Sequence, residues 1–203
     1  QENITLNKTY KKKKIEVSPA QRVELEMVAD KTNEIIKNST GSFINLEYIK
    51  GEVKTPKSPF IPSEKPKLSS VKDFKYDREI ILNSKMDHTK ENMMSWTIDD
   101  KEFPNVTPIE VKSGQIYKLR IRNNDTKNIH AMDHPMHLHG EHFQVVSVNG
   151  KEPNNIEYRD TVNIPAGGYV DIAFKIDEKG EWMFHCHILD HEDTGMMMQI
   201  NVI

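Results

Sequence analysis

The sequence predicts an all-β sandwich or barrel, and three observations favour this class. Short runs of apolar and β-branched residues recur at close intervals from about residue 74 onward. Turn-forming dipeptides such as Asn149-Gly150 and Gly167-Gly168 separate these runs. No amphipathic helical period of useful length stands out. Many short strands joined by regular turns are typical of sandwiches and barrels.

The strands of this region are expected where apolar runs lie between turn signals. Ser113-Gly114 and Lys179-Gly180 supply two further turns. The predicted strands are residues 78–82, 93–98, 109–111, 115–121, 142–148, 160–164, 169–176, 181–186 and 197–202.

The first part of the chain has a different composition. Strand-like runs are predicted at residues 14–17, 22–28 and 43–53, and Ser18-Pro19 marks a turn between the first two. Residues 55–70 place four prolines among lysines and serines, which is typical of an extended, solvated linker.

Composition excludes several classes of function. The 203 residues carry a net charge of −3, so no basic field favours binding to nucleic acid. No run approaches the roughly 20 apolar residues that a membrane-spanning helix needs. The single cysteine, Cys186, excludes an internal disulfide, and the cysteine count therefore does not fix the redox compartment.

Histidines mark the candidate chemistry, because all nine lie between His88 and His191 and most fall in two motifs. The first motif, HPMHLHG, begins at residue 134, and the second, HCHILDHEDTGM, begins at residue 185. Side chains of a strand alternate between its two faces. His185 and His187 should therefore share one face while Cys186 points to the other. His137 and His139 should share a face in the same way.

This pattern favours copper over the simpler alternatives. A thiolate, two imidazoles and a weak thioether form the ligand set of a blue-copper site, and Cys186, His134, His191 and Met196 can supply it. A tetrahedral zinc site uses four ligands and would leave several imidazoles without a role. A hydrolase needs one oriented base rather than paired histidines on either side of a thiol.

The two motifs resemble the third and fourth copper motifs of the multicopper oxidases, HPxHLHG and HCHxxxHxxxxM, and the likeness extends over residues 76–203. The resemblance implies a cupredoxin fold, a Greek-key β-barrel or sandwich. It also implies type 1 copper ligands at His134, Cys186, His191 and Met196. His137 matches a type 2 ligand, and the positions that match type 3 ligands are His139, His185 and His187.

The resemblance further implies a domain organisation and a reaction. Residues 1–54 look like the last strands of a preceding middle cupredoxin domain, residues 55–75 form the linker, and residues 76–203 form the C-terminal cupredoxin domain. Single electrons from Cu(I) or a phenolic substrate would enter at type 1 copper. They would pass through Cys186 to a trinuclear copper cluster that reduces O₂ to water.

One departure from the family pattern is large. The family uses two more histidine pairs, in HxHG and HxH motifs of an N-terminal domain, and this sequence contains neither. Type 2 and type 3 coppers would therefore be shared with the N-terminal domains of the same oxidase. We expect the 203-residue chain alone to be an inactive fragment.

The ending of the second motif looks closest to the bacterial copper-tolerance branch of the family, the cuprous oxidases. In that branch Glu192 matches a carboxylate that supplies protons to the oxygen site, and Met132 resembles a substrate-side ligand for Cu(I). His130 stands where that branch would place an acid. Membership of this branch implies an extracytoplasmic location in a bacterium. Two alternatives stay open, a stand-alone blue-copper electron-transfer or copper-binding protein and a laccase-like phenol oxidase.

Overall fold

The computed structural model describes residues 15, 17–21, 66–91, 93–125 and 131–203, together with the backbone of residues 33–37 and 43–47. The chain divides into two compact units, residues 23–61 and the remainder. Within residues 23–61, β1 (Asn33–Lys37) pairs antiparallel with β2 (Phe43–Glu47). β2 falls inside the strand predicted at 43–53. The strand predicted at 22–28 lies outside the described residues, and Ile15 and Val17 of the one predicted at 14–17 belong to no strand.

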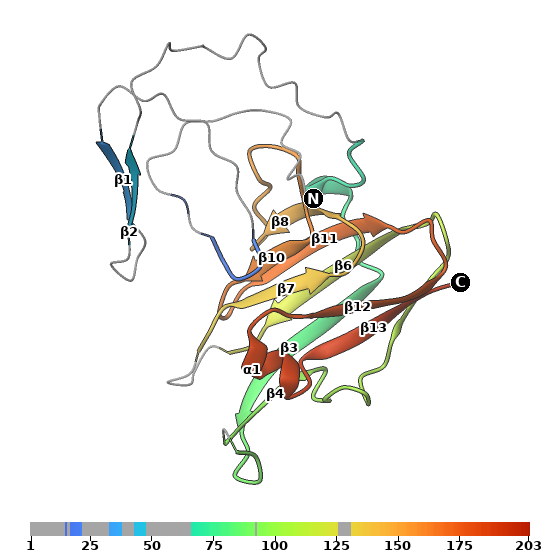
Figure 1. Ribbon diagram of the computed structural model, residues 1–203. Coiled ribbons are helices and arrows are strands. Elements are labelled where there is room, and N and C mark those ends of the chain that lie inside the picture. The colour runs from blue at the N-terminus through green and yellow to red at the C-terminus, as the bar shows by residue number, and fades with distance from the viewer. Residues whose placement is uncertain are drawn as a thin grey trace. The chain divides into compact units, whose positions relative to one another are not determined.

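The described residues of the larger unit form two β-sheets (Figure 1). One sheet has five strands in the order β10-β7-β12-β13-β5, and the other has six in the order β4-β3-β6-β11-β8-β9. The strands are β3 (Arg78–Met86), β4 (Met94–Ile98), β5 (Ile109–Val111), β6 (Ile116–Asn123), β7 (His134–Leu138), β8 (Phe143–Val148), β9 (Glu157–Arg159), β10 (Thr161–Ile164), β11 (Tyr169–Lys175), β12 (Gly180–Cys186) and β13 (Met197–Val202). In the part of the chain that the structure describes, two short helices accompany them, η1 (Val71–Asp73) and α1 (Leu189–Asp193).

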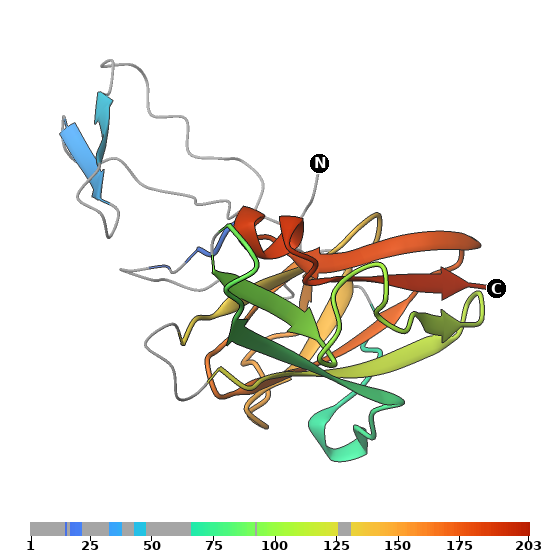
Figure 2. The ribbon, with the colours of Figure 1, turned by 90° about the horizontal axis from the view of Figure 1, so that it is seen from below.

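The sheets face each other and enclose the hydrophobic core, as the view from below shows (Figure 2). Phe143, Phe174 and Phe184 are fully buried there. Each such side chain contributes on the order of 1.5–3 kcal/mol when it leaves water. Most neighbouring strands run antiparallel, whereas β3 with β6 and β5 with β13 are parallel. The predicted all-β, cupredoxin-like sandwich is confirmed.

Among the described residues, the structure adds four elements that the sequence pattern did not predict, β1, η1, β9 and α1. β9 has three residues and α1 has five, so neither is long enough to display a period of two or of 3.6. α1 is the consequential one, because His191 lies between the strands predicted at 181–186 and 197–202, and the structure places it on this helix. Among the described residues, no helix is long and apolar enough to cross a membrane.

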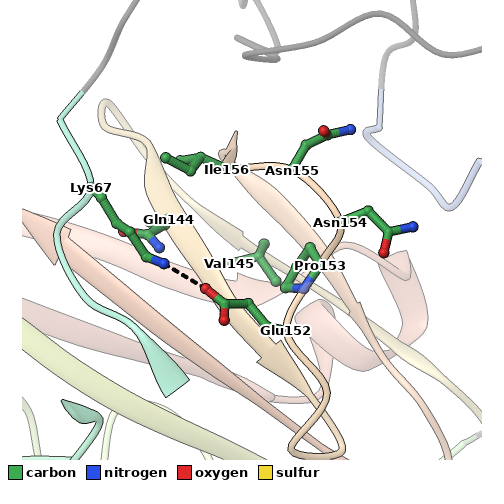
Figure 3. Close-up of a pocket in the computed structure, with 8 residues that line it drawn as sticks. All are labelled: Lys67, Gln144, Val145, Glu152, Pro153, Asn154, Asn155 and Ile156. Carbon is green, nitrogen blue, oxygen red and sulfur yellow. Dashed lines mark hydrogen bonds and ion pairs between the residues drawn. The ribbon is translucent and has the colours of Figure 1, made fainter. Parts of the chain in front are cut away.

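Residues 66–70, the end of the proline-rich segment, run along β8. Gln144 holds them, since its Oε1 accepts the backbone N–H groups of Leu68 and Ser69 at 2.7 and 3.1 Å. Lys67 forms an ion pair with Glu152 at 2.6 Å, across a surface hollow of about 300 Å³ (Figure 3). This stretch is therefore attached to the larger unit by specific polar contacts.

Candidate metal centre

Two groups of donor side chains lie on opposite faces of the sheet that contains β7 and β12. The register of these strands pairs His185 with His137 and Cys186 with Met136. Cys186 is fully buried in the core between the sheets. His185 points to the other face of the sheet, as strand alternation requires. We call the two groups the thiol cluster (His134, Cys186, His191 and Met196) and the imidazole cluster (His137, His139, His185 and His187).

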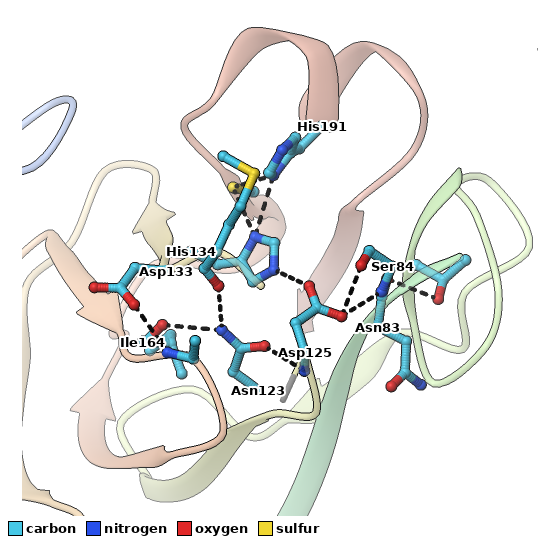
Figure 4. Close-up of polar contacts among 12 residues, drawn as sticks. Asn83, Ser84, Asn123, Asp125, Asp133, His134, Ile164 and His191 are labelled. Carbon is cyan, nitrogen blue, oxygen red and sulfur yellow. Dashed lines mark hydrogen bonds and ion pairs between the residues drawn. The ribbon is translucent and has the colours of Figure 1, made fainter. Parts of the chain in front are cut away.

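The thiol cluster converges on one point. The Nδ1 atoms of His134 and His191 are 3.1 Å apart, and they lie 3.8 and 3.5 Å from Cys186 Sγ. Figure 4 shows a dashed line that joins the two labelled rings. All three ligand atoms lie within 4.8 Å of one another, and their residues are buried. Two imidazole nitrogens and one thiol around a common point are a fitting donor set for a metal ion that prefers nitrogen and sulfur, such as copper.

Backbone hydrogen bonds hold the backbone of Met196 beside Cys186 and His191. The N–H of Met196 donates to the carbonyl of His191 at 2.9 Å, and its carbonyl accepts the N–H of Cys186 at 3.0 Å. Gly195 has φ +110°, and a Cβ there would lie 2.8 Å from the Glu102 side chain. The fully buried Met196 thus closes a tight loop, centred on α1, that begins at Cys186.

The imidazole cluster is closely spaced as well. The Nε2 atoms of His139 and His185 are 2.8 Å apart. The ligand atoms of His137, His139 and His185 lie within 4.8 Å of one another. The ring centroid of His187 is 5.5 Å from that of His137 and 5.6 Å from that of His185. The structure therefore brings all four predicted cluster histidines together.

Hydrogen bonds orient the imidazole cluster. His137 Nδ1 lies 2.9 Å from the Thr161 hydroxyl and 3.1 Å from the carbonyl of Asp160. His185 Nδ1 lies 3.0 Å from the carbonyl of Cys186 and 3.3 Å from Glu192 Oε2. With an oxygen beside each Nδ1, the ring proton is favoured on Nδ1 and the lone pair on Nε2, the usual arrangement around metal-binding histidines.

Burial dominates the electrostatics of the thiol cluster. It raises the pKa of Cys186 to about 12, with a further rise from the charge of Glu192. Burial also lowers the pKa of His191 to about 3, with repulsion from His134 acting in the same direction. At neutral pH His191 is therefore a neutral imidazole, the form that binds metals. Because the thiol is protonated at neutral pH, a metal ion that binds here must displace its proton into the solvent, which requires a metal with high affinity for thiolate.

Three residues next to the thiol cluster were missed by sequence reasoning. Trp96 of β4 stacks on His191, with ring centroids 4.3 Å apart and an interplanar angle of 19°. Asp125 and Ser84 form a buried polar group behind His134 (Figure 4). Burial by itself raises the pKa of Asp125, but hydrogen bonds from His134 and Ser84 outweigh it and hold the pKa below its ordinary value. No local pattern in the sequence reveals that this acid is buried.

Met132, His130 and Glu192 are the remaining residues that the sequence analysis singled out. Met132 is 39% exposed, and its carbonyl accepts a hydrogen bond of 2.8 Å from Asn123 Nδ2. His130 lies outside the described residues. Glu192 is on α1, with its side chain 29% exposed.

Comparison with known proteins identifies the family. The sequence profile described as multicopper oxidase matches residues 73–203. The chain belongs to the multicopper oxidase family. Membership implies that copper is its metal, and the donor sets described above suit copper.

Two solved structures and one curated relative illustrate the match of this multicopper oxidase chain. The multicopper oxidase mco of Staphylococcus aureus is 33% identical over 205 residues, covering 97% of this chain and 40% of that protein. A laccase of Pediococcus acidilactici superposes with a TM-score of 0.64 at 27% identity, covering 83% of this chain and 35% of that one. For a multicopper oxidase of Campylobacter jejuni, described as a metallo-oxidase, the TM-score is 0.57 at 29% identity, with coverages of 82% and 37%. The chain thus spans about 40% of the length of the curated multicopper oxidases that it matches.

Proposed function

We propose that this chain is the part of a multicopper oxidase that carries the type 1 copper and half of the imidazoles of the oxygen-reducing cluster. The observation that carries the proposal is the geometry of β12, which directs Cys186 to one side of the sheet and His185 to the other. When bound, copper would supply one-electron redox chemistry, taking electrons from Cu(I) or a phenol and delivering four of them to O₂ to give two waters.

The residue roles follow from the two donor sets. Cys186, His134 and His191 would be the strong type 1 ligands, with Met196 the weak axial one. His137 would hold type 2 copper. The type 3 coppers would be held by His139, His185 and His187. Cys186 is covalently continuous with His185 and His187, so the two clusters are joined by a few bonds of one backbone.

Exposure of the imidazole cluster supports the view that another domain completes it. His139 is exposed, and His137 and His187 are half-buried, although every member of the thiol cluster is fully or almost fully buried. The relatives contain more than twice the length of this chain. We propose that N-terminal domains of the same oxidase, including a middle domain that ends within residues 1–54, supply the remaining histidine pairs.

Two further residues have roles that depend on the complete enzyme. Glu192 Oε2 lies 3.3 Å from His185 Nδ1, so it can pass protons toward the oxygen-reducing cluster. Met132, partly exposed just before β7, offers a thioether that suits an incoming Cu(I) ion.

The first test of this proposal is copper titration of the chain, followed by metal analysis and the visible absorption spectrum. We expect the thiol cluster to bind one copper ion and the copper-loaded chain to show an intense blue absorption. A colourless copper complex, or a site that selects zinc when copper is in excess, would contradict the type 1 assignment.

Met196→Leu tests the axial role. Leucine keeps the apolar volume but removes one electron donor from the metal, and the loss of a donor destabilises the more highly charged Cu(II) more than Cu(I). We expect the blue absorption to remain and the reduction potential to rise, as measured by redox titration against the wild-type chain. A lower potential, or complete loss of copper, would show that Met196 is not the axial ligand.

One alternative has a specific observation in its favour. The similarity to a laccase of known structure is as extensive as the similarity to a metallo-oxidase. A laccase-like oxidase would use the same thiol cluster but accept electrons from a phenol. Relative rates with Cu(I) and with a phenol, measured in the completed enzyme, distinguish the two. A stand-alone electron carrier is disfavoured, because it has no use for the four clustered imidazoles.

A further inference from the structure

A buried carboxylate lies behind the thiol cluster on the side away from Cys186. Asp125 follows the end of β6 and is 4% exposed. An ionised carboxylate in such a place is costly unless charge-assisted hydrogen bonds compensate for lost hydration. Among the described residues, Asp125 forms its ion pair with His134, which is itself fully buried.

Both oxygens of Asp125 act as acceptors. Oδ2 lies 2.9 Å from His134 Nε2, and Oδ1 accepts the backbone N–H and the hydroxyl of Ser84 at 2.7 and 2.8 Å. Because an ionised carboxylate cannot donate, the proton in the contact with His134 must sit on Nε2. The lone pair of His134 Nδ1 is then directed toward Cys186 and His191.

The position of Asp125 is fixed by its neighbours. Its backbone N–H donates to Asn123 Oδ1 at 3.0 Å. Asn123 Nδ2 in turn donates to the carbonyls of Met132 and Ile164 at 2.8 and 3.2 Å. Figure 4 shows Asp125 between Ser84 on β3 and His134 on β7, with Asn123 of β6 bonded to its backbone. The carboxylate is therefore held on His134 by contacts from several strands.

We propose that Asp125 is a positioning residue, which fixes the metal-binding tautomer of His134 and lowers the reduction potential of the copper in the thiol cluster. This inference rests on the proposed type 1 site. A carboxylate that accepts the Nε2 proton leaves the imidazole ring more electron-rich, and partners of this kind raise the basicity of metal-bound histidines. A stronger imidazole donor and a nearby negative charge both favour Cu(II) over Cu(I).

The principal experiment is Asp125→Asn in the 203-residue chain. The amide has nearly the same shape, but one of its two ends is a donor. That end must face either His134 Nε2–H or the N–H of Ser84, so one favourable contact is lost. We expect Cu(II) affinity to fall about 10- to 100-fold. Cu(I) affinity should fall less, so the reduction potential should rise while the blue absorption persists.

Asp133→Asn is the matched control. It removes the same charge from the residue adjacent to His134. The carboxylate of Asp133, however, is exposed and binds Ala166 N–H and Asn163 Nδ2 at 2.8 and 2.7 Å. Its replacement should leave the ratio of Cu(II) to Cu(I) affinity unchanged. Equal effects of the two substitutions, or an unchanged ratio in Asp125→Asn, would overturn the inference, even though a blue wild-type chain would leave the proposed function intact.

A second measurement needs no variant and no copper. The ¹⁵N chemical shifts of the histidine ring nitrogens report the tautomer of each neutral imidazole. In the metal-free wild-type chain at pH 8 we expect the proton of His134 on Nε2. A proton on Nδ1 would remove the basis of the inference, whether or not Asp125→Asn folds.

Discussion

Replacement of Cys186 by serine should abolish the blue colour of the copper-loaded chain completely. Serine nearly matches cysteine in shape, so the buried position on β12 is preserved. An alcohol oxygen, however, is a far poorer ligand for copper than a thiolate, and the intense absorption requires charge transfer from sulfur. The measurement is the visible spectrum after titration with Cu(II), with far-ultraviolet circular dichroism to verify folding.

The control for this experiment is Met196→Leu, which removes the other sulfur of the thiol cluster. That variant should remain blue, because the thioether is a weak ligand. Retention of the blue band in the folded Cys186→Ser variant would show that the colour arises elsewhere and that the thiol cluster is not a type 1 site.

The copper-loaded 203-residue chain should not reduce O₂ faster than free copper ions in the same buffer. A trinuclear cluster of this family uses four histidine pairs, and this sequence supplies His137 with His139 and His185 with His187. The other histidines, His88, His130 and His142, lack the spacing of two residues that puts a pair on one face of a strand. Oxygen uptake with Cu(I) or a phenol as electron donor is the measurement.

The complementary experiment restores the missing ligands. The N-terminal part of a full-length relative, added in cis or as a separate polypeptide, should give rise to oxygen uptake.

In that completed enzyme, Glu192→Gln should slow oxygen reduction while the blue absorption is retained. Met132→Leu should raise the KM for Cu(I) without changing phenol oxidation. Uptake by the isolated chain at the rate of a full-length oxidase would refute the requirement for further domains.

The fold class could be predicted from the sequence because its strands are short, apolar and separated by Gly-containing turns. The clustering of the candidate donor residues could be predicted because they lie in two short sequence motifs. The alternation of histidines around Cys186 specifies which side chains share a face, and the structure brings these residues together on the predicted faces. The one-turn helix that carries His191 could not be predicted, since five residues are too few to show a helical period.

The residues that surround the donors could not be predicted. Asp125 and Ser84 are separated by 41 positions in the sequence and meet through the parallel pairing of β3 with β6. Trp96 reaches His191 from the edge strand β4 of the other sheet. Such contacts depend on how the sheets are connected and stacked. A sequence motif indicates only which side chains of one strand share a face.

The pairing of β7 with β12 makes the thiol cluster and the imidazole cluster depend on a single register. A slip of β12 by one residue would turn the thiol outward and both imidazoles inward, because strand side chains alternate. The thiol and imidazole clusters would then be lost together. The turn that follows β7 disfavours such shifts of register. Gly140 has φ +73°, and a Cβ there would lie 2.1 Å from the Trp182 ring, so the turn and β12 fit against each other in one alignment. The thiol cluster and the imidazole cluster therefore form only when this strand pair adopts its correct register.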